Sequence, residues 1–271
     1  MKWIKKILKG LLILGIAGYI SICGLLYFYQ ESLLFFPEKL EQDHQFVFEN
    51  EFEERDIITH SGNSINTLLF KRENSKGVIF YLHGNAGSLG SLGNVSEYFL
   101  PLGYDVFIID YPGYGKSSNA ITSQEELFED TQYVYDDLKK RYSEDKIVVV
   151  GYSIGTGIAA HLASNNNPFK LVLQAPYYSM INLSKRNYPM IPTFILRYDL
   201  ATNEYLKECD MPVYLFHGVD DQTIPVESSE MLSKELHLPL YKLENQGHNG
   251  IGSNKEVLKQ LHKILNDVRT Y

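Results

Sequence analysis

The chain has 271 residues, which is enough for one large domain with a full hydrophobic core or for two small ones. Hydrophobic residues make up 44% of it and charged residues 21%, as is usual for a globular protein. The net charge of −8 argues against a nucleic acid partner, because phosphate binding needs a basic surface, and the two cysteines, Cys23 and Cys209, give neither a disulfide framework nor the paired spacing of a zinc site.

The first thirty residues predict a membrane anchor. Residues 10–29 carry no charged side chain, and as a helix they span roughly 30 Å, the thickness of a bilayer core. Three aromatic residues at 27–29 end the run as an aromatic belt does, and four lysines precede it: Lys2, Lys5, Lys6 and Lys9. By the positive-inside rule, residues 1–9 form a basic cytoplasmic tail, and the chain after Glu31 lies across the membrane.

Other interpretations of this segment stay open. A cleaved signal peptide is one, although the apolar run is longer than usual and no clear small-residue cleavage site follows. A lipoprotein cysteine at Cys23 is another, although Ile22 before it is a poor match for the small residue expected there. Reversed insertion, with the domain in the cytoplasm, is a third.

Beyond a connector at 30–50, residues 51–271 predict one α/β domain. Residues 52–60 and 64–73 are strand-like, and the turn at 61–63 joins them as a hairpin. Short apolar strands then alternate with helical patterns, which predicts a mostly parallel sheet with helices on both faces. The predicted strands are 77–84, 104–113, 146–153, 171–176, 213–218 and 238–245, and the predicted helices are 88–103, 123–142, 153–165, 226–236 and 254–268.

Ligands of such sheets bind at the carboxyl ends of the strands, so the loops there are expected to form one site. These loops are residues 83–87, 110–117, 151–155, 217–225 and 245–250. The loop GYSIG, between a predicted strand and a predicted helix, matches the G-x-S-x-G pattern of a nucleophile elbow. Gly151 and Gly155 supply the lack of bulk that so tight a turn requires, and Ser153 is the predicted nucleophile.

A serine hydroxyl needs a base to take its proton, and the order serine, acid, histidine places both partners downstream. Among the later histidines, His248 lies in the glycine-flanked loop NQGHNG after the last predicted strand, and it is the predicted base. The acid follows the strand 213–218. Asp221 is preferred, because HGVDDQTIP then matches HG-x-x-D-x-x-[IV]-P, with Asp220 as the alternative.

An oxyanion hole needs two convergent backbone N–H groups. One is expected from Ile154, the residue after the nucleophile, and the other from Asn85 in the loop HGNAG, which Gly84 keeps slim. His83 is expected to hold neighbouring loops rather than to react. The loop 110–117 lacks the spacing of a phosphate-binding loop and is expected to be a structural turn in which Asp110 bonds backbone N–H groups.

These motifs together resemble the α/β-hydrolase superfamily, and most closely its membrane-anchored serine hydrolase branch, over roughly residues 32–271. Members of this branch are labelled serine-aminopeptidase-like, and eukaryotic relatives include depalmitoylases. The resemblance implies Ser153, Asp221 and His248 as a catalytic triad, the Asn85 and Ile154 amides as the oxyanion hole, and a short lid at 177–210. A proline stands at 112 where arginine is common in the branch.

The sequence therefore predicts a membrane-anchored serine hydrolase that cleaves carboxylic esters or thioesters without a metal or an organic cofactor. The expected partners are a small or lipid-like acyl ester and the bilayer around residues 10–29. Aromatic and aliphatic side chains of the lid segment either line an acyl pocket or pack on the sheet. A peptidase or amidase with the same triad, and a tethered interaction domain without activity, are the alternatives.

Overall fold

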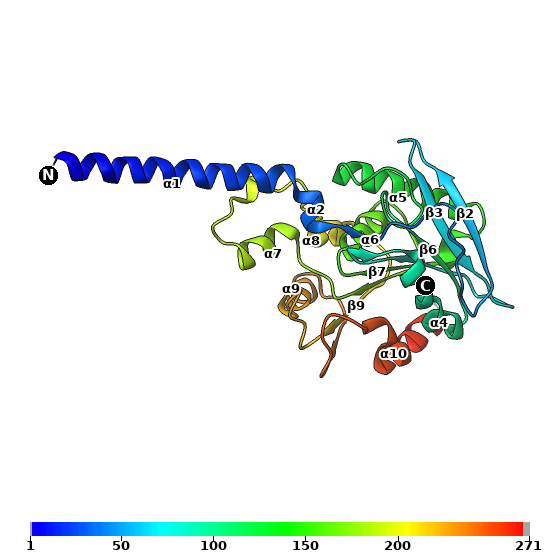
Figure 1. The fold of residues 1–271 in the computed structure, drawn as a ribbon. Coiled ribbons are helices and arrows are strands. Elements are labelled where there is room, and N and C mark those ends of the chain that lie inside the picture. The colour runs from blue at the N-terminus through cyan, green and yellow to red at the C-terminus, as the bar shows by residue number, and fades with distance from the viewer. Residues whose placement is uncertain (1, 268–271) are drawn as a thin grey trace.

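The computed structural model describes residues 2–267 (Figure 1). Helix α1, Lys2–Phe28, extends from one end of an α/β domain, and none of its residues is buried. Among the described residues it is the one helix with the length and apolar character to cross a membrane. The start of the predicted tail, the last residue of the predicted helix 254–268 and the domain's final residues lie outside the described part.

The domain is built on an eight-stranded sheet with the order β10-β9-β8-β7-β4-β6-β3-β2. The pairs β2–β3 and β3–β6 are antiparallel, and all the other pairs are parallel, which confirms the mostly parallel sheet. The strands are β2 Phe52–Ile58, β3 Ser64–Phe70, β4 Val78–Leu82, β6 Asp105–Ile109, β7 Ile147–Tyr152, β8 Lys170–Gln174, β9 Val213–Gly218 and β10 Leu240–Leu243.

Helices cover both faces of this sheet, as the continuous apolar runs of its central strands require. Every residue of β4, β6 and β8 is buried. One core lies under α5 Gln124–Lys139, α6 Gly155–Ser164 and α9 Glu227–Leu236, and the other lies under α4 Ser96–Phe99 and α10 Lys255–Asn266. Figure 1 shows α5 and α6 on one side of the sheet, with α4 and α10 on the other.

The predicted helix at 88–103 is wrong in one respect, because the segment forms four short turns instead of one helix. These are α3 Leu89–Leu92, a 3₁₀ turn Gly93–Val95, α4, and a 3₁₀ turn Leu100–Leu102. Pro101 lacks the N–H that a continuous helix would use. A Cβ on Gly93 would stand 2.3 Å from Phe48 Cζ, so the backbone at Gly93 packs directly against that ring.

Residues 30–50, expected as a connector, pack along the domain beside the strand ends. They contain α2 Gln30–Leu34 and the two-residue strand β1 Phe36–Pro37, which pairs in parallel with β5 Ala86–Gly87. Phe35 and Phe46 are buried in the two cores.

The segment 177–210 contains α7 Met180–Asn187, a 3₁₀ turn Thr193–Ile195, α8 Thr202–Tyr205 and a 3₁₀ turn Leu206–Glu208. Its aromatic residues differ in burial, and Tyr178 and Tyr205 are partly buried. Tyr177 and Tyr198 are fully buried in the core, whereas Tyr188 and Phe194 are exposed. The remaining 3₁₀ turns are Glu144–Lys146 and Ile251–Ser253.

Candidate active site

The turn from β7 to α6 holds Ser153 in a strained backbone conformation. Its φ is +53°, in the left-handed region that non-glycine residues rarely adopt. The turn is packed tightly against β4. A Cβ on Gly155 would stand 2.3 Å from the Leu82 carbonyl oxygen, and one on Gly151 would stand 2.6 Å from the Gly155 carbonyl oxygen. Both positions therefore require glycine, for the reason that the pattern predicts.

Ser153, His248 and Asp221 form one chain of hydrogen bonds. The imidazole Nε2 of His248 lies 3.0 Å from Ser153 Oγ, and its Nδ1 lies 2.7 Å from Asp221 Oδ2. The carboxylate accepts the Nδ1 proton, which leaves Nε2 as an acceptor for the serine hydroxyl. The three side chains come from the ends of β7 and β9 and from the loop after β10, 27 to 95 residues apart in the chain.

Asp221 is fixed from its other side by backbone N–H groups. Its Oδ1 accepts hydrogen bonds from Thr223 and Ile224, both at 2.8 Å. Burial would raise the pKa of Asp221, but hydrogen bonds from His217, His248 and Ile224 hold it well below its ordinary value. The carboxylate is therefore charged at neutral pH.

The neighbouring residues have other places. Asp220 is exposed, so the structure brings Asp221 rather than Asp220 to the imidazole. His217 is fully buried, with Nε2 against the Ile224 carbonyl at 2.8 Å and Nδ1 against Ser229 Oγ at 2.6 Å. Nε2 also lies 3.3 Å from Asp221 Oδ2, so the ring is held between Ser229 of α9 and the loop 217–225 that carries the acid.

The directions of the Ile154 and Asn85 N–H groups, the pair expected to form the oxyanion hole, follow from the carbonyls that precede them. Each of these carbonyls already accepts a hydrogen bond. The Ser153 carbonyl accepts hydrogen bonds from the Thr156 N–H at 2.9 Å and hydroxyl at 2.6 Å, inside the first turn of α6. In a planar trans peptide the next N–H, that of Ile154, points the opposite way. The Gly84 carbonyl lies 2.6 Å from His83 Nδ1, and by the same argument the Asn85 N–H points away from the His83 ring.

The side chains of His83 and Asp110 are buried together beneath the loop 83–87. Burial lowers the pKa of His83 to about 4, so the ring is neutral and its Nδ1–H donates to Gly84. Burial also raises the pKa of Asp110 to about 8, against the opposing effect of the Leu89 N–H, which donates to both carboxyl oxygens at 3.0 and 3.1 Å. Asp110 thus binds a backbone N–H, but that of Leu89 in α3 and not one within the turn 110–117, where the sequence predicts the bond.

Sequence reasoning missed two contributors to this site. Tyr152 Oη lies 3.0 Å from the His248 carbonyl oxygen and so holds the loop that carries the imidazole. Its place between Gly151 and Ser153 was the available signal. The second contributor is the connector, because the Phe36 N–H and the Tyr114 hydroxyl both donate to the Asn85 carbonyl at 2.7 Å. No motif in the connector indicates that contact.

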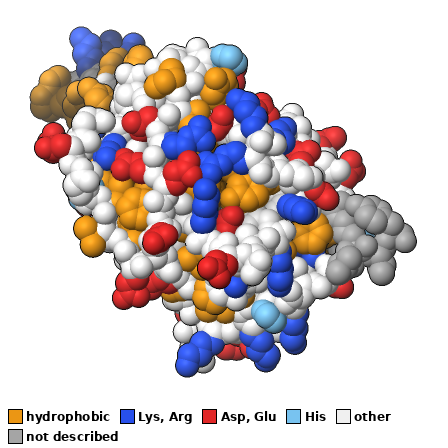
Figure 2. All heavy atoms as spheres, turned by 90° about the vertical axis from the view of Figure 1, so that its right-hand side faces the viewer, with side chains coloured by type: hydrophobic (Ala, Val, Ile, Leu, Met, Phe, Trp, Pro, Cys, Tyr) orange, Lys and Arg blue, Asp and Glu red, His pale blue; other side chains and the backbone are white. Residues whose placement is uncertain are grey.

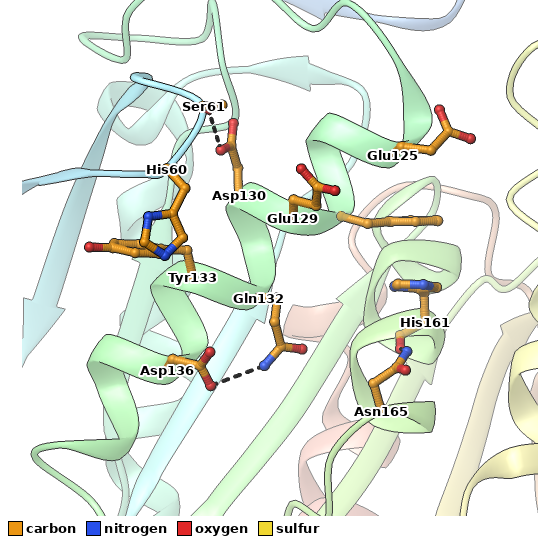
Figure 3. Close-up of a pocket in the computed structure, with 11 residues that line it drawn as sticks. His60, Ser61, Glu125, Glu129, Asp130, Gln132, Tyr133, Asp136, His161 and Asn165 are labelled. Atoms are coloured by element: carbon orange, nitrogen blue, oxygen red, sulfur yellow. Dashed lines mark hydrogen bonds between the residues drawn. The ribbon is translucent and has the colours of Figure 1, made fainter.

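A separate groove lies away from these residues, between the β2–β3 turn, α5 and α6 (Figure 3). Its volume is about 590 Å³, and acidic side chains such as Glu125, Glu129 and Asp136 line it. The His161 ring stacks on Phe128 with 3.7 Å between centroids. None of the predicted site residues lines this groove.

Comparison with known proteins finds one matching family model and several relatives that share the same name. A model of the family described as serine aminopeptidase, S33, matches residues 73–202. A lysophosphatidylserine lipase ABHD12 of Danio rerio is 28% identical over 181 residues, 59% of this chain and 47% of that protein. The Rattus norvegicus protein of the same name is 30% identical over 169 residues, 55% and 42% of the two chains. The chain thus spans a little under half the length of these curated relatives.

The fold has close counterparts among solved structures. An esterase of Pyrococcus furiosus superposes with a TM-score of 0.68 at 18% sequence identity, over 86% of this chain and 96% of the esterase. That likeness, the matched family model and the strand-end motifs agree. The chain has the α/β-hydrolase fold, and its sequence is similar to members of the α/β-hydrolase superfamily.

Proposed function

We propose that this protein is a membrane-anchored serine hydrolase that cleaves carboxylic ester bonds. The observation that carries the proposal is the hydrogen-bonded chain Ser153–His248–Asp221 at the carboxyl edge of the sheet. The relatives named lipase and esterase support ester hydrolysis over other hydrolytic reactions. The charge-free part of helix α1, from Gly10 onward, supplies the anchor, and the lysines before it lie on the cytoplasmic side.

In the proposed reaction, Ser153 Oγ attacks the ester carbonyl while His248 Nε2 takes the hydroxyl proton. The Ile154 and Asn85 N–H groups stabilise the oxyanion of the tetrahedral intermediate. His248 returns the proton to the leaving alcohol, and the ester C–O bond breaks to give an acyl-enzyme. Water, deprotonated by His248, then attacks the acyl-enzyme, and the carboxylic acid leaves as Ser153 regains its proton. Asp221 stabilises the imidazolium formed in each half of the cycle.

The test is hydrolysis of p-nitrophenyl esters from acetate to palmitate by the full chain in detergent. We expect Ser153→Ala to reduce kcat by roughly 10⁵-fold or more, because the nucleophile is lost while the fold is kept. Ser164→Ala, at the far end of the same helix α6, is the matched control and should retain full activity. Equal rates for wild type and Ser153→Ala on every ester would refute the proposal.

A serine peptidase is a second candidate, because the matched family model describes serine aminopeptidases. The same triad serves amide cleavage, but the amine leaving group requires protonation before it departs. Comparing an aminoacyl p-nitroanilide with the ester of the same acyl group distinguishes the two. A kcat/KM that is higher for the anilide would favour the peptidase, and one that is higher for the ester, or for the matching thioester, would favour the esterase.

A further inference from the structure

A nine-residue part of the lid segment lies against the anchor helix. We call residues 188–196 the lid strip; it follows α7 and has the sequence YPMIPTFIL. The Tyr19 hydroxyl in α1 donates to the Met190 carbonyl at 2.7 Å, and the Gln30 side-chain amide donates to the Ile195 carbonyl at 2.8 Å. Figure 1 shows the chain after α7 reaching up to α1.

The first of these contacts fixes where the strip lies along the helix. Tyr19 stands ten residues before Tyr29, which is about 15 Å of helix and half of the charge-free run 10–29. A bilayer that encloses the whole run must therefore also enclose the chain bonded to its midpoint. Either the strip lies in lipid or the second half of the run does not.

The side chains of the strip favour lipid. The strip contains no charged residue. Phe194 is 87% exposed, Met190 77% and Tyr188 65%, although each is large and apolar. The face of the domain turned away from α1 is different, because acidic and basic side chains alternate across it with only small hydrophobic areas between them (Figure 2). Exposed apolar side chains gathered in one segment indicate an interaction surface.

The backbone of the strip is partly paired, which lowers the cost of its polar groups in a nonpolar medium. Two of its residues are prolines and carry no N–H. The N–H groups of Ile191, Ile195 and Leu196 donate to carbonyls within the strip. Two further carbonyls accept from the side chains of Tyr19 and Gln30, which belong to the anchor and the helix after it.

Cationic side chains border the strip on both sides. Lys185 and Arg186 are exposed in the last turn of α7, just before it. Arg197, just after it, lies 5.8 Å from the centroid of the Tyr27 ring and pairs with Glu31 at 2.7 Å. Tyrosine, lysine and arginine at the edge of an apolar segment are typical of the level of lipid headgroups.

We propose that the lid strip inserts into the bilayer beside α1, so that the domain contacts lipid at two points and its lid borders the leaflet. The proposal rests on the anchor assigned under the proposed function. It places the site close to the membrane, because Phe36, whose N–H binds the Asn85 carbonyl, follows Tyr29 by only seven residues, at most about 25 Å of chain. A lipid ester then enters from the leaflet rather than from water.

The test uses tryptophan as a depth probe, because Trp3 is the only tryptophan in the chain. In a Trp3→Phe background, Phe194→Trp reports on the strip, and Ile16→Trp reports on the anchor. Val47→Trp is the matched control, because Val47 is 87% exposed, like Phe194, but lies outside the strip. The full-length variants are reconstituted in phosphatidylcholine vesicles with and without brominated acyl chains, which quench tryptophan on contact.

We expect strong quenching at positions 194 and 16 and little at 47. Quenching at 16 with none at 194 beyond that at 47 would overturn the proposal, and concentration-dependent emission at 194 would instead assign the strip to a second copy of the chain. No quenching at 16 would overturn both the anchor and the insertion. Ser153-dependent ester hydrolysis, measured on the same samples, tests the proposed chemistry separately.

A second measurement examines substrate entry. We expect Met190→Ser combined with Phe194→Ser to raise KM for a long-chain ester in vesicles about tenfold or more, because two buried apolar contacts with lipid are lost. Hydrolysis of p-nitrophenyl acetate in water should be unchanged, since neither residue belongs to the triad or the amide pair. An unchanged KM for the vesicle substrate, or equal loss on both substrates, would contradict entry from the leaflet.

Discussion

The Tyr152 hydroxyl lies 3.0 Å from the carbonyl oxygen of His248, so the residue before the proposed nucleophile holds the loop of the proposed base. The two rings also lie 5.4 Å apart between centroids. We therefore expect Tyr152 to act as a positioning residue that keeps the imidazole over Ser153.

Tyr152→Phe should lower kcat several-fold and leave KM nearly unchanged. The phenyl ring keeps the packing, but the hydrogen bond that restrains the loop is worth about 1 kcal/mol. Steady-state kinetics on a p-nitrophenyl ester measure the change. Tyr241→Phe, in β10 and away from the site, is the control. A kcat equal to that of the wild type would show that the loop holds its position without this bond.

The paired aspartates give a sharp test of the acid. Asp221→Asn should reduce kcat about 10⁴-fold, because the amide no longer stabilises the imidazolium or selects the right tautomer of His248. Asp220→Asn, one residue away and exposed, should stay within twofold of the wild type. Both variants are compared by kcat at neutral pH with circular dichroism as a check on folding. The reverse ranking would exclude Asp221 as the acid.

Gly155→Ala should destabilise the fold by at least about 2 kcal/mol, because the added methyl would stand 2.3 Å from the Leu82 carbonyl oxygen and force the elbow off β4. Gly252→Ala meets its nearest atoms at an ordinary 3.6 Å and is the matched control. Urea unfolding measures both free energies. A neutral Gly155→Ala would contradict the tight approach of the elbow to the strand.

The buried His83 should make the fold sensitive to acid. Its pKa is about 4 in the folded chain against 6.5 ordinarily, so between these values the unfolded chain binds a proton that the folded chain does not. The contribution of His83 to the free energy of unfolding therefore falls as the pH falls from 6.5 through 4, opposite in sign to that of Asp110, whose raised pKa adds stability on acidification. His83→Asn, which keeps a donor for the Gly84 carbonyl, should remove the His83 contribution, so its stability relative to the wild type should rise as the pH falls through this range.

Unfolding midpoints measured across this pH range test the expectation, and kcat gives an independent readout. At neutral pH His83→Asn should retain more activity than His83→Ala, because only asparagine can still orient the Gly84–Asn85 peptide. Equal kcat for the two variants would mean that His83 does not position that amide. A difference in stability between the wild type and His83→Asn that stays constant from pH 6.5 to 4 would contradict the depressed pKa of His83.

Much of the fold could be predicted because the relevant signals are local. Runs of buried β-branched residues identify the central strands, and glycine spacing identifies the elbow around Ser153. The segment 88–103 was harder, because its apolar spacing is helical while Pro101 and the packing of Gly93 under Phe48 interrupt it. Periodicity alone does not report such tertiary packing.

The parts that escaped sequence reasoning depend on contacts between distant segments. The connector looks like a spacer because Asn85, whose carbonyl binds the Phe36 N–H, lies 49 residues away in the loop 83–87. Within the segment 177–210, residue type alone does not indicate that Tyr177 and Tyr198 are buried while Tyr188 and Phe194 are exposed. Side-chain type indicates a preference for burial, and the folded chain decides which of several candidates is covered.

The pairing of β1 with β5 limits where the domain can be separated from the proposed anchor. A soluble form that begins at residue 51, where the strands of the main sheet start, would lose Phe35 from the core and leave the Asn85 carbonyl without the Phe36 N–H. A form that begins at Gln30 keeps both. For crystallisation or inhibitor screening, the cut therefore belongs directly after Tyr29, and a shorter fragment with weak activity would report a damaged loop rather than a poor substrate.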